Sequence, residues 1–573
     1  MAGLTTPAGA RPAIVVLGRS ALPVARRIQA ACAGSRIHGL HARVDGEADV
    51  VGFARLREHL LRLYAQRVPI VALCAAGIVI RCIAPLLDDK GGEPPVLCVA
   101  EDGSAVVPLL GGLAGVNALA REIARTLGVA PAITTSGELR FGTCLLDPPR
   151  GYVLADLEQG KHFVSDLLAG EHARVDGDAP WLDGAPIALR DDARLTIRVT
   201  PLASKPRRDE LVIHPRCVIA CVAQTETETT AATIVQALRA QGLATHALAA
   251  LLAPASRIED PALAAAAHAL GAPLRFSDGA ADPAQLLATS TDPRYELRAP
   301  LDGVTLAIAP APVDPERIGR GRGRLSVVGL GPGRAGLLAP DARAALDDAT
   351  DVLGYTTYVK MAGPLRADQR VHGTDNREEL RRARHAFELA AEGRRVVVVS
   401  SGDPGVFAMA AAVFEVLDGA DDARWKSVDL RIVPGISAAM ATAAKAGAPL
   451  GHDFCVLSLS DNLKPWSVIE TRLRHAAQAD LVMAFYNPIS RARPWQLDRA
   501  LEIVREWRAP GTRVVLGRDV GRPDEALVTT TLGALQSAQV DMRTMVIVGS
   551  SATRGIVGGP NGEWIYTPRG YAT

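Results

Sequence analysis

Two glycine-rich turns, each at the end of a run of β-branched residues, are the parts of this chain best suited to hold a ligand. One closes the segment 325–333 (LSVVGLGPG) and the other the segment 396–405 (VVVVSSGDPG). A buried parallel strand that ends in such a turn brings flexible backbone to a ligand at its carboxyl end. Gly329 and Gly331 match part of a dinucleotide fingerprint, but no third glycine follows at the required spacing, and Pro332 has no N–H for a pyrophosphate. A nicotinamide cofactor is therefore not expected.

Further short motifs follow in the C-terminal half: VPGISA at 433–438, APLGHDFC at 448–455, SLSD at 458–461, PW at 465–466, FYNP at 485–488 and TPRGY at 567–571. In this order, from about Leu325 to the C terminus, they resemble the tetrapyrrole methylases, and among them the precorrin-3B C(17)-methyltransferases. The resemblance implies a two-lobed fold, with lobes of about 324–436 and 437–573. It also implies S-adenosylmethionine as methyl donor and methylation of precorrin-3B at carbon 17, with ring contraction to precorrin-4, in cobalamin biosynthesis.

The same resemblance implies a set of cofactor-binding residues: Gly331, Pro332, Ser401, Gly402, Asp403, Val406, Ser437, Ala438, Asn487 and Thr530. Gly402 lets the backbone approach a ligand closely, and Asp403 offers an acceptor to an amino or hydroxyl group. Alternatives remain open for two of them. Asp403 is also suited to cap a helix that starts near Gly405, and Ser437 has the same competing explanation.

Methyl transfer from a sulfonium is an in-line displacement, so the position of the reactants matters more than acid strength. The ring contraction implied by the resemblance would gain from removal of a proton from a substrate hydroxyl. His452, Asp453 and Asp461 are the candidate general bases, with structural hydrogen bonding as an equally weighted alternative for each. The implied macrocycle carries carboxylates, for which the following arginines are candidates: Arg491, Arg493, Arg518, Arg522 and Arg569.

Motifs in the N-terminal half (GIVIRCIAP at 77–85, Lys90, PV at 95–96 and ITTSGE at 133–138) resemble the cobalt-precorrin-5A hydrolases, which open a lactone and release a two-carbon aldehyde. The turn GGLAGVN at 111–117 has Leu113 and Ala114 where that family typically shows histidine, so an imidazole that could activate water is missing.

We therefore expect this half to be a degenerate hydrolase that binds the tetrapyrrole, with Arg81 and Lys90 clamping substrate carboxylates. The alternative is a bifunctional enzyme with an active lactone hydrolase and a cobalt-factor III C(17)-methyltransferase. In that case another residue, such as His38, His41 or Glu138, supplies the base.

Composition limits the fold class and the kinds of binding partner that the chain can have. A chain of 573 residues with 48% hydrophobic but only 4% aromatic residues predicts several α/β domains. The chain has 63 Lys plus Arg and 62 Asp plus Glu, so it has no large net charge that would attract nucleic acid or a membrane surface. Eight scattered cysteines without a Cys-Xaa-Xaa-Cys pair predict reduced thiols and no metal site. We expect a cytoplasmic protein, and the resemblance implies a homodimer through the methylase half.

The hydrophobic pattern predicts the domain order. An α/β domain occupies 1–147, with strands near 13–17, 70–74 and 132–135, a helix over 51–66 between the first two, and Arg81 in a strand-like apolar run. A poorly periodic middle segment (148–205), a second small α/β domain (206–309) and a linker rich in Pro, Gly and Arg (310–323) follow. The methylase then covers 324–573.

Overall fold

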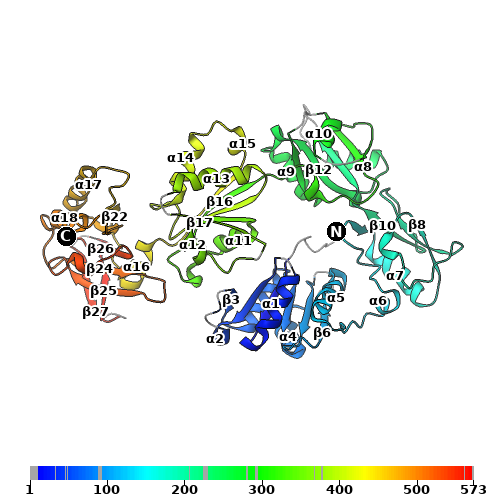
Figure 1. Cartoon of the computed structure of the whole chain (residues 1–573), viewed down its shortest axis with the longest axis horizontal. Helices are drawn as coiled ribbons and strands as arrows, with labels where there is room; N and C mark the ends of the chain where they lie inside the picture. Colours follow the sequence, from blue (N-terminus) through cyan, green and yellow to red (C-terminus); the bar gives the residue numbers. More distant parts are fainter. Residues whose placement is uncertain are drawn as a thin grey trace. The chain divides into compact units, whose positions relative to one another are not determined.

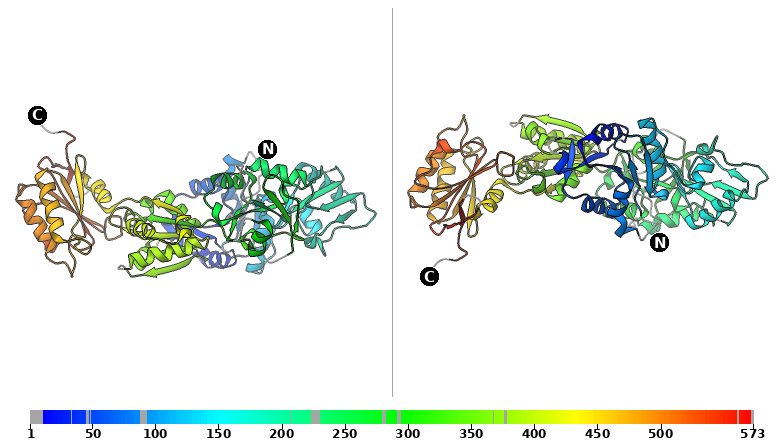
Figure 2. Two further views of the ribbon diagram at one scale, coloured as in Figure 1. Left: turned by 90° about the horizontal axis from the view of Figure 1, so that it is seen from above. Right: turned by 90° about the horizontal axis from the view of Figure 1, so that it is seen from below.

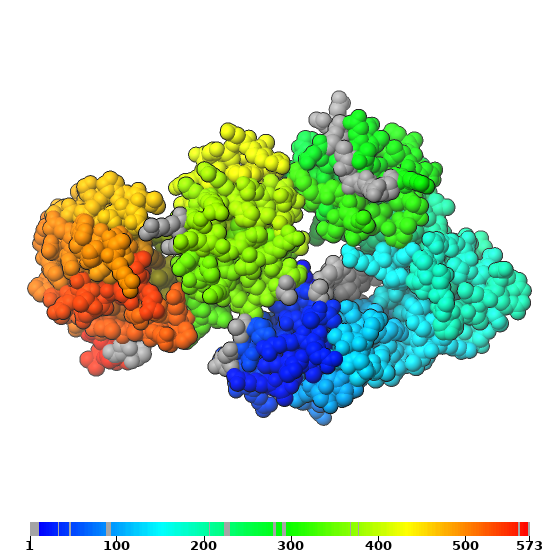
Figure 3. Space-filling view, in the orientation of Figure 1, coloured from blue at the N-terminus to red at the C-terminus, as the bar shows by residue number. Residues whose placement is uncertain are grey.

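The computed structural model of the chain describes residues 11–32, 34–44, 47, 49–87, 93–205, 207–222, 230–278, 282–290, 294–366, 368–375, 378–559 and 562–570, which are the coloured atoms of Figure 3. The chain divides into two compact units, residues 1–323 with 364–369 and residues 324–363 with 370–573. Each unit consists of sheets flanked by helices (Figure 1), so the predicted multidomain α/β class is confirmed.

The first sheet of the N-terminal unit has the order β3-β2-β1-β4-β5-β6, and all its neighbours are parallel except the pair β5 and β6. Its strands are β1 (Ala13–Val16), β2 (Arg36–Leu40), β3 (Val50–Phe53), β4 (Ile70–Leu73), β5 (Val96–Val99) and β6 (Val106–Leu110). Its helices are α1 (Leu22–Ala31), α2 (His41–Val44), α3 (Leu56–Ala65), α4 (Ala76–Ile83), α5 (Val116–Leu127) and α6 (Ser136–Phe141). Alternate strand residues pack on opposite faces, against α1 and α5 on one side and α3 and α4 on the other.

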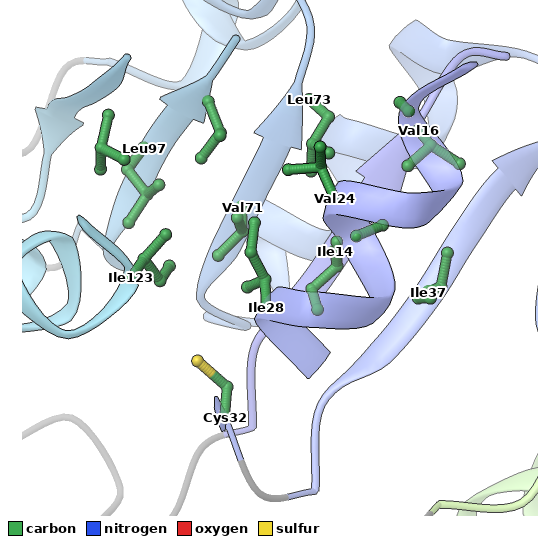
Figure 4. Packing of buried hydrophobic residues seen from close by; sticks show 14 of the residues in the cluster. Ile14, Val16, Val24, Ile28, Cys32, Ile37, Val71, Leu73, Leu97 and Ile123 are labelled. Carbon is green, nitrogen blue, oxygen red and sulfur yellow. The ribbon is translucent and has the colours of Figure 1, made fainter. Parts of the chain in front are cut away.

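Figure 4 shows the α1 face of this sheet, where Val24 and Ile28 of the helix lie over Ile14 and Val71 of the central strands. These side chains are buried, as the unbroken runs of apolar residues in β1 and β4 predict for strands covered on both faces. Because β6 runs antiparallel to β5, the turn at 111–115 that leads into α5 leaves the sheet at the amino end of β5.

Three local predictions for this domain were wrong. Arg81 lies on the helix α4 rather than on a strand, and only Val79 and Ile83, four residues apart, are buried in that helix. Helical spacing of the buried positions thus overrides the strand-like composition. Residues 132–135 form no strand, since α6 begins directly after them. The segment 51–66, which resembles one helix, begins with the edge strand β3 before α3.

Two further sheets complete the N-terminal unit. One has the order β7-β10-β9-β8 and the other β13-β12-β11-β15-β14. Their strands are β7 (Tyr152–Leu154), β8 (Ala173–Asp176), β9 (Leu195–Val199), β10 (Glu210–Pro215), β11 (Val218–Val222), β12 (Leu248–Pro254), β13 (Leu274–Ser277), β14 (Glu296–Leu297) and β15 (Val304–Ile308). Their helices are α7 (Leu157–Leu168), α8 (Ala231–Ala240), α9 (Pro261–Leu270) and α10 (Pro283–Ser290). The middle segment therefore forms a sheet of its own, and it includes β10, which the sequence analysis assigned to the domain 206–309.

The C-terminal unit begins with a sheet of order β18-β17-β19-β16-β20, in which every pair is parallel. Its strands are β16 (Arg324–Gly329), β17 (Asp351–Tyr355), β18 (Arg370–Thr374), β19 (Arg395–Ser400) and β20 (Asp429–Val433). Its helices are α11 (Pro340–Asp348), α12 (Thr356–Met361), α13 (Glu379–Ala391), α14 (Met409–Asp418) and α15 (Ala423–Lys426). Because β16 lies between β19 and β20, the turns after these three strands emerge side by side at one edge of the sheet.

The rest of this unit is built on a mixed sheet of order β22-β23-β26-β24-β25 and a small sheet of order β21-β28-β27. The strands are β21 (Gly447–Ala448), β22 (Phe454–Ser458), β23 (Val482–Tyr486), β24 (Arg513–Arg518), β25 (Ala526–Thr531), β26 (Thr544–Val548), β27 (Arg554–Val557) and β28 (Glu563–Tyr566). The helices α17 (Trp466–Gln478) and α18 (Gln496–Arg505) cover one face of the mixed sheet, and α16 (Ala438–Ala446) covers the other, as Figure 2 shows. Within the described residues, no helix is long and apolar enough to cross a membrane.

Candidate active site

The turns that follow β16, β19 and β20 contact one another through their backbones. Gly331 donates its N–H to the carbonyl of Gly402 (3.0 Å), and Gly402 donates its N–H to the carbonyl of Gly331 (2.8 Å). A Cβ on Gly435, in the turn after β20, would lie only 2.2 Å from the Gly402 oxygen. Gly331 and Gly402 both have φ of +69°, a conformation that glycine adopts without strain. The three turns therefore form one glycine-lined cradle, which brings together Gly331 and Gly402 as predicted.

Asp403 fastens this cradle. Its Oδ1 accepts a hydrogen bond from the N–H of Gly405 (2.8 Å), and its Oδ2 accepts one from the N–H of Gly435 (3.0 Å). The alternative, a cap on a helix starting near Gly405, is wrong, because α14 begins at Met409. A carboxylate has about four acceptor positions, so Asp403 keeps acceptor capacity for a ligand while it joins two turns.

Ser437 and Ala438 border the cradle at the start of α16. A Cβ on Gly402 would lie 3.6 Å from Ser437 Cα and 3.8 Å from the Ala438 nitrogen. Ser437 Oγ accepts a hydrogen bond from the N–H of Met440 at 3.4 Å, so the capping alternative is confirmed for this serine. Ser401 and Val406 are half-buried on the same turn as Gly402.

From the mixed sheet, β23 brings Tyr486 and Asn487 toward α16. The Tyr486 hydroxyl accepts a hydrogen bond from the N–H of Ala439 (3.1 Å). Asn487, with φ of +52°, donates from Nδ2 to Ser458 Oγ (3.0 Å). Its amide is therefore held at the carboxyl ends of β22 and β23.

Thr530 is not brought to the other predicted residues. It pairs with Val514 across β24 and β25, and Val514 packs in the core beneath α17 and α18. Residues paired across antiparallel strands point to the same face. Thr530 therefore lies on the face away from α16, whereas Thr529 pairs with Val515, which packs with α16.

The three candidate bases do not share one site. His452 and Asp453 immediately precede β22, whereas Asp461 follows its carboxyl end. Five strand residues span roughly 16 Å, so the two ends cannot act on one group. Asp453 donates its backbone N–H to His452 Nδ1 (2.7 Å), and Asp461 Oδ2 accepts from Gln496 Nε2 (3.1 Å). Only Asp461 lies at the same end of the sheet as Asn487.

In the N-terminal unit, a cavity of about 160 Å³ lies at the amino end of α5. Its lining residues are Gly112, Gly115, Asn117, Ala118, Arg121, Glu138, Thr143, Cys144, Asp147, Pro149 and Trp181. The turn predicted from Gly111 to Asn117 is present, with φ of +81° at Gly111 and +84° at Gly115. The cavity thus adjoins the position where the resembled hydrolases carry histidine.

Of the alternative bases, Glu138 is among the lining residues, whereas His38 and the predicted clamp residue Arg81 are not. Arg81 donates to the carbonyl of Gly77 (3.1 Å) within its own helix, and Lys90 is outside the described residues. His38 is on β2, which three strands separate from β6, and its ring bonds to His59 (3.1 Å). Within the described residues, no group of three His, Cys, Asp or Glu side chains is arranged to hold a metal ion.

Comparison with known sequences matches residues 324–536 to the Tetrapyrrole (Corrin/Porphyrin) Methylases and residues 58–138 to the family described as Cobalamin synthesis G N-terminal. A precorrin-3B C(17)-methyltransferase from Sinorhizobium sp is 51% identical over 250 residues, which cover 44% of this chain and 98% of that protein. The chain belongs to the tetrapyrrole methylase family. Members of this family are S-adenosylmethionine-dependent methyltransferases, and the chain is an enzyme of that class.

Two further proteins are similar to this chain. The cobalamin biosynthesis protein CobIJ from Mycobacterium tuberculosis is 47% identical over 253 residues, which cover 44% of this chain and 48% of CobIJ. The crystal structure of the methyltransferase CobJ is 54% identical, with coverage of 43% of this chain and 100% of that chain and a TM-score of 0.41.

Sequence reasoning missed a second contact to the methylase cradle, the turn after β24. A Cβ on Gly521 would lie 2.8 Å from Pro332 Cγ, and Arg522 donates from Nε to the Pro332 carbonyl (3.4 Å). The sequence contains a signal for this contact, because Gly521 follows a buried strand just as Gly331 does. Phe407 was also missed; it has φ of +53°, is 52% exposed and lies with its ring 5.4 Å from that of Tyr486.

The structure also distinguishes among the arginines of the methylase that are candidates for binding substrate carboxylates. Arg493 is buried and donates to the carbonyl of Asn487 (2.9 Å), so it supports the site structurally. Arg491 and Arg569 are exposed. Arg518 and Arg522 each place a nitrogen 3.5 Å from the buried carboxylate of Asp519.

Proposed function

We propose that the C-terminal unit transfers a methyl group from S-adenosylmethionine to carbon 17 of precorrin-3B, with contraction of the macrocycle to precorrin-4, in cobalamin biosynthesis. The observation that carries this proposal is the 51% identity over 98% of the length of a precorrin-3B C(17)-methyltransferase. The cradle supports it, because Gly331, Gly402 and Gly435 let the turns at the carboxyl ends of three parallel strands approach closely, and ligands of such sheets bind at these ends.

Each part of the site has a distinct task in this reaction. The bound cofactor supplies an activated methyl group, and the cradle with Asp403 and Ala438 holds it in place. Arg518 and Arg522 offer guanidinium groups to the substrate carboxylates. Asp461 is the candidate base for the substrate hydroxyl, because it alone of the three candidates lies at the same end of the sheet as Asn487.

The test is to incubate the full chain with S-adenosylmethionine and either metal-free precorrin-3B or cobalt-factor III, and to weigh the products. One added methyl group, found with one of the two substrates, is the expected result and also identifies the metal state. Neither substrate gaining a methyl group would overturn the proposal.

A second candidate function, lactone hydrolysis by the N-terminal unit, is favoured by one observation, the carboxylate of Asp147 in the cavity at α5, whose pKa is raised by burial and by Glu138. Retention of the tetrapyrrole without hydrolysis is the competing proposal for this unit. We also propose, from the family resemblance alone, a cytoplasmic homodimer formed through the methylase.

A further inference from the structure

Two histidines face each other on the first sheet of the C-terminal unit, outside the turns that form the cradle. His372 lies on the edge strand β18, and His385 lies on α13. Nδ1 of His372 and Nε2 of His385 are 3.4 Å apart, and the centroids of the two rings are 5.1 Å apart. The partners of the two outer nitrogens decide what can lie between these inner ones.

A buried carboxylate fixes the ring of His372. Nε2 of this ring lies 2.8 Å from Oδ1 of Asp351, which is fully buried and forms an ion pair with Arg394. Asp351 also accepts a hydrogen bond from the hydroxyl of Thr350 (2.8 Å). A carboxylate in an ion pair can only accept hydrogen bonds, so Nε2 of His372 carries a proton. Nδ1 of the neutral ring therefore presents its lone pair.

His385 has the same arrangement on the other side. Its Nδ1 lies 3.4 Å from Oε2 of Glu388, three residues farther along α13. Donation to this carboxylate leaves the lone pair of the neutral ring on Nε2, which is the nitrogen that faces His372. Two lone pairs thus point at each other across 3.4 Å, which is unfavourable unless a positive charge lies between them. Either an additional proton or a metal ion can supply that charge.

A histidine pair of the N-terminal unit shows the contrasting case. His59 Nε2 lies 3.1 Å from His38 Nδ1, and His59 Nδ1 lies 2.7 Å from Nη2 of Arg62. A guanidinium has no acceptor, so Arg62 donates to Nδ1, and the proton of His59 is on Nε2, which donates to His38. Burial and the charge of Arg62 lower the pKa of His59 to about 4, so this ring is neutral near neutral pH. The pair is an ordinary hydrogen bond and needs no further charge.

The geometry of the His372–His385 pair fits a metal ion. Zinc–imidazole bonds are about 2.0–2.1 Å long, so two nitrogens on one tetrahedral ion lie roughly 3.4 Å apart, with ring centroids about 5 Å apart. The observed separations are 3.4 Å and 5.1 Å. In metal sites the second nitrogen of a ligating histidine typically donates to a carboxylate, which orients the ring. Asp351 and Glu388 occupy these positions.

We propose that His372 and His385 together bind a divalent transition-metal ion that favours imidazole, such as Zn²⁺, Ni²⁺ or Cu²⁺, and that this ion joins β18 to α13. The protein supplies two ligands, because no group of three His, Cys, Asp or Glu side chains in the described part of the chain is arranged to hold a metal ion. The remaining positions on the ion are open to solvent, since the side chain of His385 is 42% exposed.

The surrounding charges favour a cation at this place. Arg394 offsets the charge of Asp351, and Glu388 adds a negative charge beside the two neutral rings. The expectation of no metal site was based on the spacing of the cysteines, whereas these histidines lie 13 residues apart on a strand and a helix. This inference goes beyond the proposed methylation and does not depend on it.

The experiment titrates the metal-free full chain with zinc chloride at pH 7.5 and measures binding by calorimetry. The variants are His385→Ala and, as matched control, His475→Ala, which removes an exposed histidine from the helix α17 of the same unit. We expect the unaltered chain and His475→Ala to bind zinc alike, and His385→Ala to bind one ion fewer. Zinc should also raise the melting temperature of the C-terminal unit in the first two proteins only, because an ion held by the folded state stabilises it.

Equal zinc binding by the unaltered chain and His385→Ala would overturn the proposal, and the pair would then hold a proton. Binding that appears only at zinc concentrations far above that of the protein, in both alike, would have the same meaning. Should His385→Ala fail to fold, Glu388→Gln decides, because Glu388 is exposed and both ligands stay in place. An affinity lowered roughly tenfold or more supports the site, and an unchanged affinity excludes it.

Discussion

Asp403 of the C-terminal unit and Asp147 of the N-terminal unit both stand beside glycine-rich turns, but their surroundings differ. Asp403 accepts hydrogen bonds from two backbone N–H groups and joins the turns of β19 and β20. Asp147 has no such partner among the described residues, and burial beside Glu138 raises its pKa to about 6. The comparison teaches that an aspartate at a glycine turn joins backbone segments when their N–H groups bind it, and that burial without such donors raises its pKa.

The largest expected effect comes from closing the cradle that Asp403 fastens. Gly402→Val places a β-branched side chain at a φ of +69°, next to Ser437 and Ala438. Left-handed backbone costs a non-glycine residue about 1–2 kcal/mol, and a β-branched residue more. In the proposed binding mode, the side chain also enters the space of the cofactor. We expect S-adenosylmethionine binding, measured by calorimetry on the full chain, to be lost.

Gly336→Val is the matched control, since a Cβ on Gly336 would meet no atom within 4 Å. It should bind the cofactor like the unaltered protein. A folded Gly402→Val variant with undiminished affinity would show that the cofactor lies elsewhere in the unit, and the cradle would then be only a structural junction.

A smaller effect on cofactor binding is expected when the hydrogen bonds of Asp403 are weakened. In Asp403→Asn one side-chain oxygen becomes an NH₂ group, which cannot accept from Gly405 or Gly435. Hydrogen bonds to charged groups contribute about 1.5–3 kcal/mol, so cofactor affinity should fall on the order of tenfold to hundredfold. Asp422→Asn is the control, because Asp422 also accepts from a backbone N–H but joins no turns. Equal affinity in both variants would remove Asp403 from the site.

The difference between local and long-range contacts explains which features could be predicted from the sequence. Local patterns were sufficient to predict the strands β16 and β19, the turns at Gly331 and Gly402, and the capping role left open for Ser437. Each of these depends on residues close together in the chain.

The contacts that decide roles are formed over long separations and were not predictable. Asp403 binds the N–H of Gly435, 32 residues away, and the Pro332 carbonyl binds Arg522, 190 residues away. Thr530 was placed with the cofactor by its motif, but the strand register turns it to the opposite face, and a shift of one residue would reverse this. Asp147 carried no motif at all, because its basicity comes from burial beside Glu138.

The smallest expected effect is on the stability of the N-terminal unit. It tests the part of the comparison that concerns Asp147. Its folded pKa of about 6 exceeds the ordinary value of 3.8, so the folded state binds the proton more tightly than the unfolded state. The stability that this difference provides is fully present below about pH 3.8 and is lost as the pH rises through 6. At pH 7.5 the buried charge thus destabilises the N-terminal unit, by at most about 3 kcal/mol.

Asp147→Asn removes this charge without changing the size of the side chain. The melting transition of the N-terminal unit, followed by scanning calorimetry on the full chain, should therefore rise at pH 7.5, and the gain should shrink toward pH 4.5. A variant that is more stable at neutral pH yet no longer hydrolyses a lactone would mark a charge kept for function rather than for folding. If Asp147→Asn instead destabilises the unit equally at both pH values, Asp147 has a structural role like that of Asp403, and the difference between the two aspartates disappears.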